Sequence, residues 1–122
     1  MRKISRKTHG VIDYLSVGFM SAAPWLFGFS TNLPASICFY ISAAAVLFLS
    51  LFTNYELGIR KSIPMAFHLD MDMVLGLLLA TSPWLFGFAQ EVYLPHVLTG
   101  AFAMVAGLIS QPNSLYKGVQ IP

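Results

Sequence analysis

Long apolar stretches separated by short polar ones dominate the pattern of this sequence. A helix that crosses a bilayer needs about 20 mostly apolar residues, because about 30 Å of hydrocarbon is crossed at about 1.5 Å per residue. The stretches that qualify run from about Val11 to Phe29, Pro34 to Phe52, Met71 to Phe88 and Leu94 to Ile109. The pattern therefore predicts four membrane-spanning helices and leaves no room for a fifth.

The connections between these stretches predict how the helices pair. The connections over residues 30–33 and 89–93 are short, so each should join two neighbouring helices into an antiparallel hairpin. The middle connection, from about Thr53 to Asp70, is longer and polar, and Pro64 marks a boundary before the third helix. We therefore expect an all-α, integral membrane four-helix bundle that forms a single domain over residues 1–122.

An internal repeat divides the chain into two similar halves. The hexapeptide Pro-Trp-Leu-Phe-Gly-Phe at residues 24–29 recurs 59 residues later at residues 83–88, and a second apolar stretch follows each copy. The repeat units extend over about residues 9–52 and about residues 68–109. Each unit contains two spans, so both enter the membrane in the same direction. The two hairpins should therefore be parallel, related by a pseudo-two-fold axis along the membrane normal.

Composition narrows the class of protein. The chain is 57% hydrophobic and only 10% charged, whereas soluble domains average about 25% charged residues. The hydrophobicity excludes a disordered chain, and the scarcity of basic residues excludes nucleic acid as a partner. A single cysteine, Cys38, provides neither a disulfide framework nor a CxxC motif. We expect no cofactor. The expected partners are the lipid bilayer and either further copies of the chain or a larger membrane protein.

The seven basic residues predict an orientation. They are Arg2, Lys3, Arg6 and Lys7 before the first span, Arg60 and Lys61 in the middle connection, and Lys117 after the last span. Neither hairpin loop contains one, so all seven fall on the side that the positive-inside rule assigns to the cytoplasm. We therefore expect a multi-pass protein of the inner (plasma) membrane with cytoplasmic N- and C-termini.

The repeated motif also carries a resemblance. Ser82-Pro83-Trp84, together with the apolar residues that follow, resembles the SPW repeat family of small bacterial and archaeal membrane proteins. That family carries two copies of the motif in a four-span chain, so the resemblance covers essentially the whole sequence. The first copy departs at one position, where Ala23 replaces the serine. The resemblance implies the architecture but no biochemical activity.

The motif itself predicts the structure of the hairpin tips. Its candidate structural residues are Pro24 and Pro83, Trp25 and Trp84, Gly28 and Gly87, and Ser82. Each proline removes a helix hydrogen bond, each tryptophan suits the interfacial aromatic belt, and each glycine permits a tight turn or a close approach. We expect an anchored tip on the outer side; the alternative is a freed carbonyl and an indole that line a small site.

The two repeats share one set of ionisable groups, His9 with Asp13 and His68 with Asp72. A spacing of four residues places each pair on one helix face, near the cytoplasmic end of the first and third spans. The simplest interpretation is helix-end capping with a local His–Asp hydrogen bond. If the pseudo-two-fold axis brings the pairs together, two imidazoles and two carboxylates would form a proton relay or a site for a divalent metal.

These observations favour a non-enzymatic protein of structural or accessory type, because no expected span has an ionisable residue near its middle. Two alternatives remain: a small oligomeric transporter or channel, and a metal- or proton-responsive membrane protein that uses the His–Asp pairs. An enzyme is disfavoured, because Cys38 alone cannot support paired-thiol chemistry and the three histidines lie at the edges of the spans.

Overall fold

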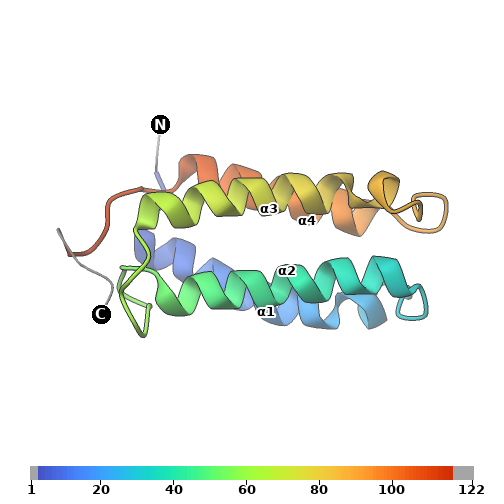
Figure 1. Cartoon of the computed structure of the whole chain (residues 1–122), viewed down its shortest axis with the longest axis horizontal. Coiled ribbons are helices and arrows are strands. Elements are labelled where there is room, and N and C mark those ends of the chain that lie inside the picture. Colours follow the sequence, from blue (N-terminus) through green and yellow to red (C-terminus); the bar gives the residue numbers. More distant parts are fainter. Residues whose placement is uncertain (1–2, 117–122) are drawn as a thin grey trace.

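Four helices in sequence order make up the computed structural model, which describes residues 3–116 (Figure 1). The helices are α1 (Arg6–Leu26), α2 (Leu33–Phe52), α3 (Met65–Leu85) and α4 (Leu94–Ile109). In the described part of the chain there are isolated β-bridges between Ile4 and Ser110 and between Thr53 and Ile63, but no strand. The prediction of an all-α fold is confirmed.

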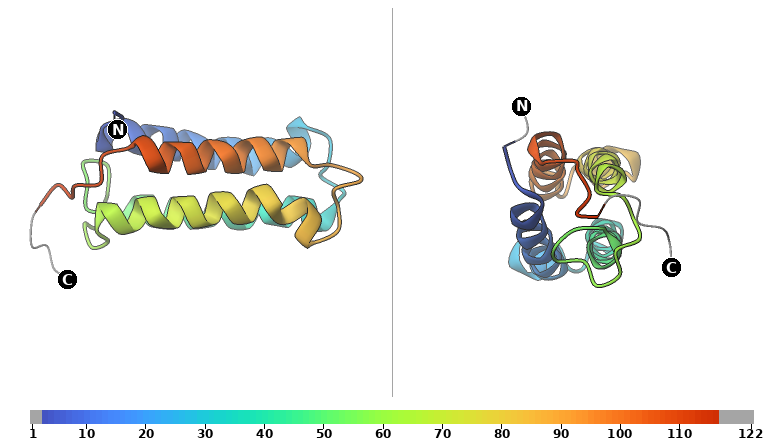
Figure 2. Two further views of the ribbon diagram at one scale, coloured as in Figure 1. Left: turned by 90° about the horizontal axis from the view of Figure 1, so that it is seen from above. Right: turned by 90° about the vertical axis from the view of Figure 1, so that its left-hand side faces the viewer.

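The helices pair as two antiparallel hairpins, α1 with α2 and α3 with α4 (Figure 1). The end view in Figure 2 shows the helices at the four corners of a bundle, with α1 beside α4 and α2 beside α3. Residues 27–32 and 86–93 form the two hairpin tips at one end of the bundle. The connection over residues 53–64 lies at the other end, where α1 begins and α4 ends.

Two of these helices, α2 and α3, are long and apolar enough to cross a membrane, with mean hydropathies of 2.2 and 1.3. The fourth helix, α4, is apolar but has 16 residues. Length and composition in the described residues therefore support two of the four expected spans directly, and the other two remain predictions.

The first and third helices begin earlier than the apolar pattern predicted. They start at Arg6 and Met65 instead of Val11 and Met71, and the added residues include Arg6 and His9 in α1 and His68 and Asp70 in α3. The side chain of Ser5 caps α1 by accepting a hydrogen bond of 3.1 Å from the N–H of Thr8. No acidic residue stands in the first turn of either helix. The expectation that the aspartates cap these helices is therefore wrong, because they lie in the third turn.

The hexapeptide motif terminates α1 and α3. Both of its glycines, Gly28 and Gly87, have φ of 74°, a left-handed conformation that glycine adopts without steric penalty. In the first copy the N–H of Phe29 donates to the carbonyl of Pro24 at 2.8 Å, and the N–H of Gly28 donates to that of Trp25 at 3.3 Å. These two bonds make a Schellman motif, so the proline stands in the last turn and the helix stops there.

The second copy repeats this ending and adds a serine. The N–H of Phe88 donates to the carbonyl of Pro83 at 2.8 Å. Because proline has no N–H, it leaves the carbonyl of Leu79 without its helical donor. The hydroxyl of Ser82 donates to that carbonyl at 2.6 Å. Ala23 has no hydroxyl with which to make the equivalent bond in the first copy.

Candidate functional site

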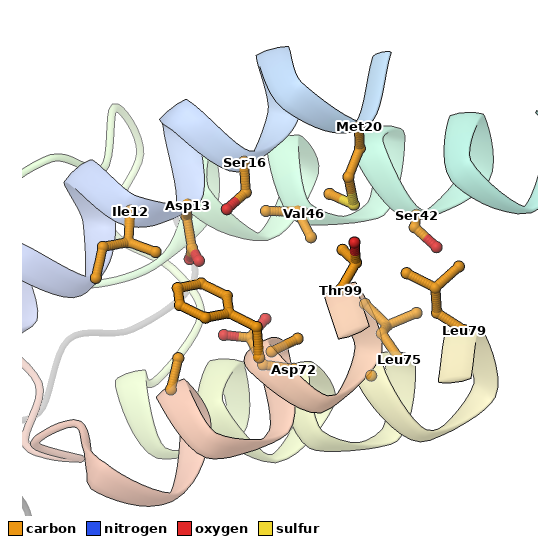
Figure 3. A pocket seen from close by; sticks show the side chains of 14 residues that line it. Ile12, Asp13, Ser16, Met20, Ser42, Val46, Asp72, Leu75, Leu79 and Thr99 are labelled. Carbon is orange, nitrogen blue, oxygen red and sulfur yellow. The ribbon is translucent and has the colours of Figure 1, made fainter. Parts of the chain in front are cut away.

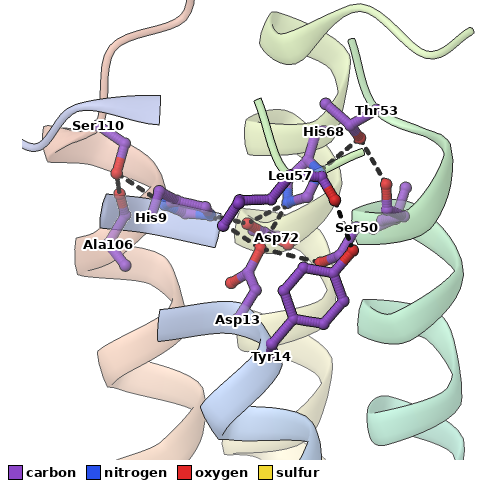
Figure 4. A network of polar contacts seen from close by, with 11 residues as sticks. His9, Asp13, Tyr14, Ser50, Thr53, Leu57, His68, Asp72, Ala106 and Ser110 are labelled. Carbon is purple, nitrogen blue, oxygen red and sulfur yellow. Dashed lines mark hydrogen bonds and ion pairs between the residues drawn. The ribbon is translucent and has the colours of Figure 1, made fainter. Parts of the chain in front are cut away.

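The two His–Asp pairs meet between the hairpins, near the end of the bundle that holds the middle connection (Figure 4). The Nε2 atom of His9 lies 2.8 Å from Oδ2 of Asp72, and Nε2 of His68 lies 2.8 Å from Oδ2 of Asp13. Within each repeat, the distance from the histidine Nε2 to the aspartate Oδ2 is 3.2 Å, both for His9 with Asp13 and for His68 with Asp72. The expected local His–Asp bond is thus the longer one, and the shorter contacts join one repeat to the other.

These four side chains, which we call the His–Asp cluster, are almost completely enclosed. The exposed fractions are 1% for His9, 10% for Asp13, 0% for His68 and 5% for Asp72. The imidazole rings stand edge to face, with centres 5.3 Å apart. One potential ligand atom from each residue lies within 4.8 Å of the other three. Of the arrangements considered from sequence, the convergence of both pairs is the one found.

One hydroxyl group contacts the far side of each imidazole ring. Nδ1 of His9 lies 2.7 Å from Oγ of Ser110, and Nδ1 of His68 lies 2.6 Å from Oγ1 of Thr53. Thr53 and Ser110 are the residues that follow α2 and α4, so they occupy equivalent places in the two repeats. The 59-residue offset does not align these two positions, because α2 has 20 residues and α4 has 16. The sequence signal that could have identified them is a hydroxyl residue directly after the second helix of each repeat.

Those hydroxyls fix which ring nitrogen carries hydrogen. Each hydroxyl donates to the carbonyl four residues earlier, from Thr53 to Leu49 at 2.5 Å and from Ser110 to Ala106 at 2.6 Å. A hydroxyl has a single hydrogen to donate, so its oxygen accepts from the adjacent imidazole. Both Nδ1 atoms therefore carry hydrogen, and both Nε2 atoms face the carboxylates.

The connection between α2 and α3 closes the end of the cluster. Tyr55 is fully buried, and its ring centre lies 6.0 Å from that of His68. Gly10 packs against the ring of Tyr55 so closely that a Cβ atom on residue 10 would overlap that ring. The hydroxyl of Tyr14 donates to the carbonyl of Leu57 at 3.0 Å and fixes the loop to α1.

An ion pair fastens the same connection to the start of α1. Nη2 of Arg6 lies 2.9 Å from Oε2 of Glu56, and Nε donates to Oε1 at 3.2 Å. Nη1 of Arg6 also donates to the carbonyl of Asn113 at 3.3 Å, so the same arginine contacts the segment after α4 as well as the middle connection. The hydrogen bond from Arg6 lowers the pKa of the Glu56 carboxyl below its ordinary value.

A small cavity adjoins the two carboxylates and continues along the bundle between the helices (Figure 3). Its volume is about 40 Å³, which is room for at least one water molecule. Its polar lining consists of Asp13, Ser16, Ser42, Asp72 and Thr99. The carboxylates therefore face both the imidazoles and a small internal space that is otherwise lined largely by apolar side chains.

The repeated tryptophans stand at the other end of the bundle, far along the helices from the His–Asp cluster. Trp25 and Trp84 are 65% and 60% exposed. Trp25 packs on Tyr40 and Trp84 on Tyr93, with ring centres 5.9 and 6.0 Å apart. The structure does not bring the Pro-Trp motif and the His–Asp pairs into one site.

The same end contains two contacts across the pseudo-two-fold axis. Nδ2 of Asn32 donates to Oε1 of Glu91 at 2.5 Å, and these positions are 59 residues apart. His96, the third buried histidine, places Nε2 2.9 Å from the carbonyl oxygen of Ala35. The repeats are thus joined at both ends of the bundle.

Comparison with known proteins agrees with this architecture. The family profile described as the SPW repeat domain matches residues 7–110, which contain all of α1 but its first residue, the other three helices and the whole His–Asp cluster. No curated protein and no solved structure matches the chain. The matched family comprises small membrane-associated proteins with no established activity. The chain belongs to the SPW repeat family.

Proposed function

We propose that this chain is a four-pass protein of the inner (plasma) membrane that acts as a structural or accessory component and not as an enzyme. The observation that carries the proposal is the distribution of side chains, apolar outside and polar inside. Large apolar side chains are exposed on every helix, for example Leu15 at 70%, Phe48 at 58%, Leu77 at 52% and Leu98 at 64%. Such a surface suits lipid, in which the polar groups must satisfy one another internally.

The charge distribution supports cytoplasmic termini. The described basic residues at the end with the middle connection are Lys3, Arg6, Lys7, Arg60 and Lys61. The two hairpin tips contain Glu91 and no lysine or arginine. Arg2 and Lys117 lie outside the described residues. Under the positive-inside rule the basic end faces the cytoplasm and the tips face outward.

The His–Asp cluster supports a structural role. Its shorter contacts join α1 to α3, so each repeat supplies the partners for the charged or polar groups of the other. A polar network that is satisfied inside an apolar bundle specifies one way of packing the hairpins. The exposed apolar surface then contacts the lipid bilayer, with a second copy of the chain or a larger membrane protein as the further partner.

Cysteine labelling tests the topology. In a Cys38→Ser background, single cysteines replace Lys61 in the middle connection and Gln90 in the second hairpin tip. A membrane-impermeant maleimide should label Gln90→Cys in intact cells and Lys61→Cys only after the cells are opened. The reverse result contradicts the orientation, and recovery of the protein in the soluble fraction contradicts the membrane assignment.

The accessory role predicts an assembly larger than one chain. Membranes that contain the protein at its natural level are extracted without denaturation, and the mass of the released particle is measured by native mass spectrometry. We expect a particle heavier than the 13.4 kDa chain, either a multiple of that mass or a complex with another membrane protein. A particle of 13.4 kDa alone contradicts the accessory role.

The internal cavity favours one second candidate, a small transporter or channel for protons or small cations. Its lining includes two carboxylates in the third turns of α1 and α3, farther into the bundle than the helix entrance that the sequence predicts for them. The test is ion flux into vesicles that contain the purified protein. Flux that is abolished by Asp13→Asn supports transport, and the absence of flux above that of empty vesicles contradicts it.

A further inference from the structure

We propose that the His–Asp cluster is a binding site for a single divalent transition-metal ion of the zinc class. The ligand atoms would be Nε2 of His9, Nε2 of His68, Oδ2 of Asp13 and Oδ2 of Asp72. This site goes beyond the structural role proposed above, and its test does not depend on how the chain is oriented in the membrane.

The hydrogen bonds of the imidazoles prepare them to bind a metal. Thr53 and Ser110 accept hydrogen from the Nδ1 atoms, because their own hydroxyl hydrogens are committed to backbone carbonyls. A neutral ring with hydrogen on Nδ1 presents the lone pair of Nε2, which is the atom that faces the cluster. Metal-binding histidines almost always donate their second N–H to an oxygen in this manner, which fixes the tautomer and the ring orientation.

The spacing of the four atoms matches tetrahedral coordination. Zinc binds imidazole nitrogen and carboxylate oxygen at about 2.0–2.1 Å, which places neighbouring ligands of a tetrahedral site about 3.3 Å apart. The nitrogen-to-oxygen distances here are 2.8 Å for the contacts between repeats and 3.2 Å for those within each repeat. All four atoms lie within 4.8 Å of one another, so metal binding would draw the more widely separated atoms closer by up to about 1.5 Å.

Charge balance is also compatible with a divalent ion. Asp13 and Asp72 are two buried carboxylates, and each lies within 3.2 Å of Nε2 of both imidazoles, so hydrogen on Nε2 compensates their charge when no metal is bound. A metal ion would take the place of that hydrogen. Two carboxylates and two neutral imidazoles neutralise one divalent cation. The adjacent cavity of about 40 Å³ borders both carboxylates.

The donor set selects the class of metal. Imidazole nitrogen suits zinc, iron, nickel and copper, whereas magnesium and calcium prefer all-oxygen sites. Four protein ligands with no open position correspond to a structural zinc site. Because two ligands come from α1 and two from α3, bound metal would join the two repeats at their pseudo-two-fold axis.

Metal titration of the full chain tests the site directly. Protein purified in detergent micelles is treated with a chelator and then titrated with Co²⁺, followed by Zn²⁺. We expect saturation at one ion per chain, the intense visible absorption of tetrahedral Co²⁺, and its loss when Zn²⁺ displaces the cobalt. Failure of both ions to saturate at one per chain overturns the proposal, as does Ca²⁺ binding that is as tight as Zn²⁺ binding.

A matched pair of variants on one helix assigns the ligands. Asp72→Asn removes a ligand charge while keeping the shape, and Asp70→Asn makes the same change at an exposed position two residues away. We expect Asp72→Asn to weaken Zn²⁺ binding by on the order of 100-fold or more, with no change in Asp70→Asn. Equal affinities for both variants and the original chain overturn the assignment.

The hydroxyl partner supplies a second test that leaves all four ligands in place. Thr53→Val removes the acceptor for Nδ1 of His68, and Thr53→Ser restores it. Loss of such a partner weakens metal binding about 10–100-fold, so we expect that loss in the valine variant and recovery in the serine variant. Circular dichroism of each variant verifies the fold. Tight binding by a folded valine variant contradicts the proposed role of the hydroxyl and with it the described ligand geometry.

Discussion

Ser82 satisfies the carbonyl that Pro83 leaves free, and this makes a specific prediction. Ser82→Ala removes the 2.6 Å hydrogen bond to the carbonyl of Leu79 in a buried position. We expect a loss of about 1–3 kcal/mol in the free energy of unfolding, the range for a buried group deprived of its partner. Denaturant unfolding in detergent micelles, followed by circular dichroism, measures it.

Thr81 provides the control for this prediction. Its hydroxyl donates to the carbonyl of Leu77 at 2.9 Å in the same helix, but position 81 retains the backbone N–H that serves that carbonyl. Thr81→Ala should therefore change the free energy of unfolding by less than about 0.5 kcal/mol. Equal losses in the two variants would mean that the hydroxyl of Ser82 does not compensate for the proline.

Glu56 makes the attachment of the middle connection dependent on pH. Its pKa is lowered by the hydrogen bond from Arg6, so the folded chain holds the ionised form more strongly than the unfolded chain. The resulting stabilisation is present above the ordinary glutamate pKa of about 4.3. It is lost as the pH falls through the lowered value in the folded chain.

The variant Glu56→Gln tests this dependence, with the original chain as reference. The variant should be less stable at neutral pH by at most about 1 kcal/mol, because the pair is partly exposed. The difference should disappear at acid pH, where Glu56 is protonated in both states. A difference that remains constant down to acid pH contradicts the role of the carboxylate charge.

The existence and order of the helices followed from the apolar stretches, as did the starts of α2 and α4 to within one residue, whereas the starts of α1 and α3 did not. The first turns of α1 and α3 contain charged or polar residues such as Arg6 and His68, which hydropathy reads as loop. In the structure these turns are held by the Ser5 cap and by the cluster itself, and neither is visible as a run of apolar residues. The ends of α1 and α3 were predicted at Phe29 and Phe88 but lie at Leu26 and Leu85, because the left-handed Gly28 and Gly87 stop each helix within the motif.

The backbones of α3 and α4 approach each other closely at Gly76 and Gly100. A Cβ atom on Gly76 would stand 2.6 Å from the carbonyl oxygen of Gly100 and 3.1 Å from the backbone N of Met104. Gly76→Ala must therefore separate the two backbones, and we expect a loss of about 1–3 kcal/mol in the free energy of unfolding. Denaturant titration in micelles measures the loss.

Gly18 in α1 is the matched control, because a Cβ atom there would meet no atom within 4 Å. Gly18→Ala should leave stability unchanged or raise it by up to about 1 kcal/mol through helix propensity. If Gly76→Ala behaves in the same way, the α3–α4 contact is less tight than the structure indicates.

Pseudo-two-fold symmetry relates the halves of the molecule, and it explains which part of the site could be predicted. The repeat offset identified His9, Asp13, His68 and Asp72 as equivalent pairs and allowed their convergence. The repeat offset could not decide between convergence of the two pairs and local capping within each helix, because that choice depends on how the two hairpins face each other. Thr53, which completes the site, was not identified by the repeat offset, because the second helices of the two repeats differ in length.

The same symmetry predicts that the His–Asp cluster unfolds as one unit. With a chelator present, Asp13→Asn and Asp72→Asn should each lower the free energy of unfolding by about 3–5 kcal/mol, because each leaves an imidazole of the other repeat without its partner. The double variant should lose less than the sum of the two, by about 0.5–3 kcal/mol, since both carboxylates contact both rings. Asp70→Asn, exposed on α3, should change stability by less than about 0.5 kcal/mol. Losses that add in the double variant would instead describe two independent local pairs, one in each hairpin, with no coupling across the pseudo-two-fold axis.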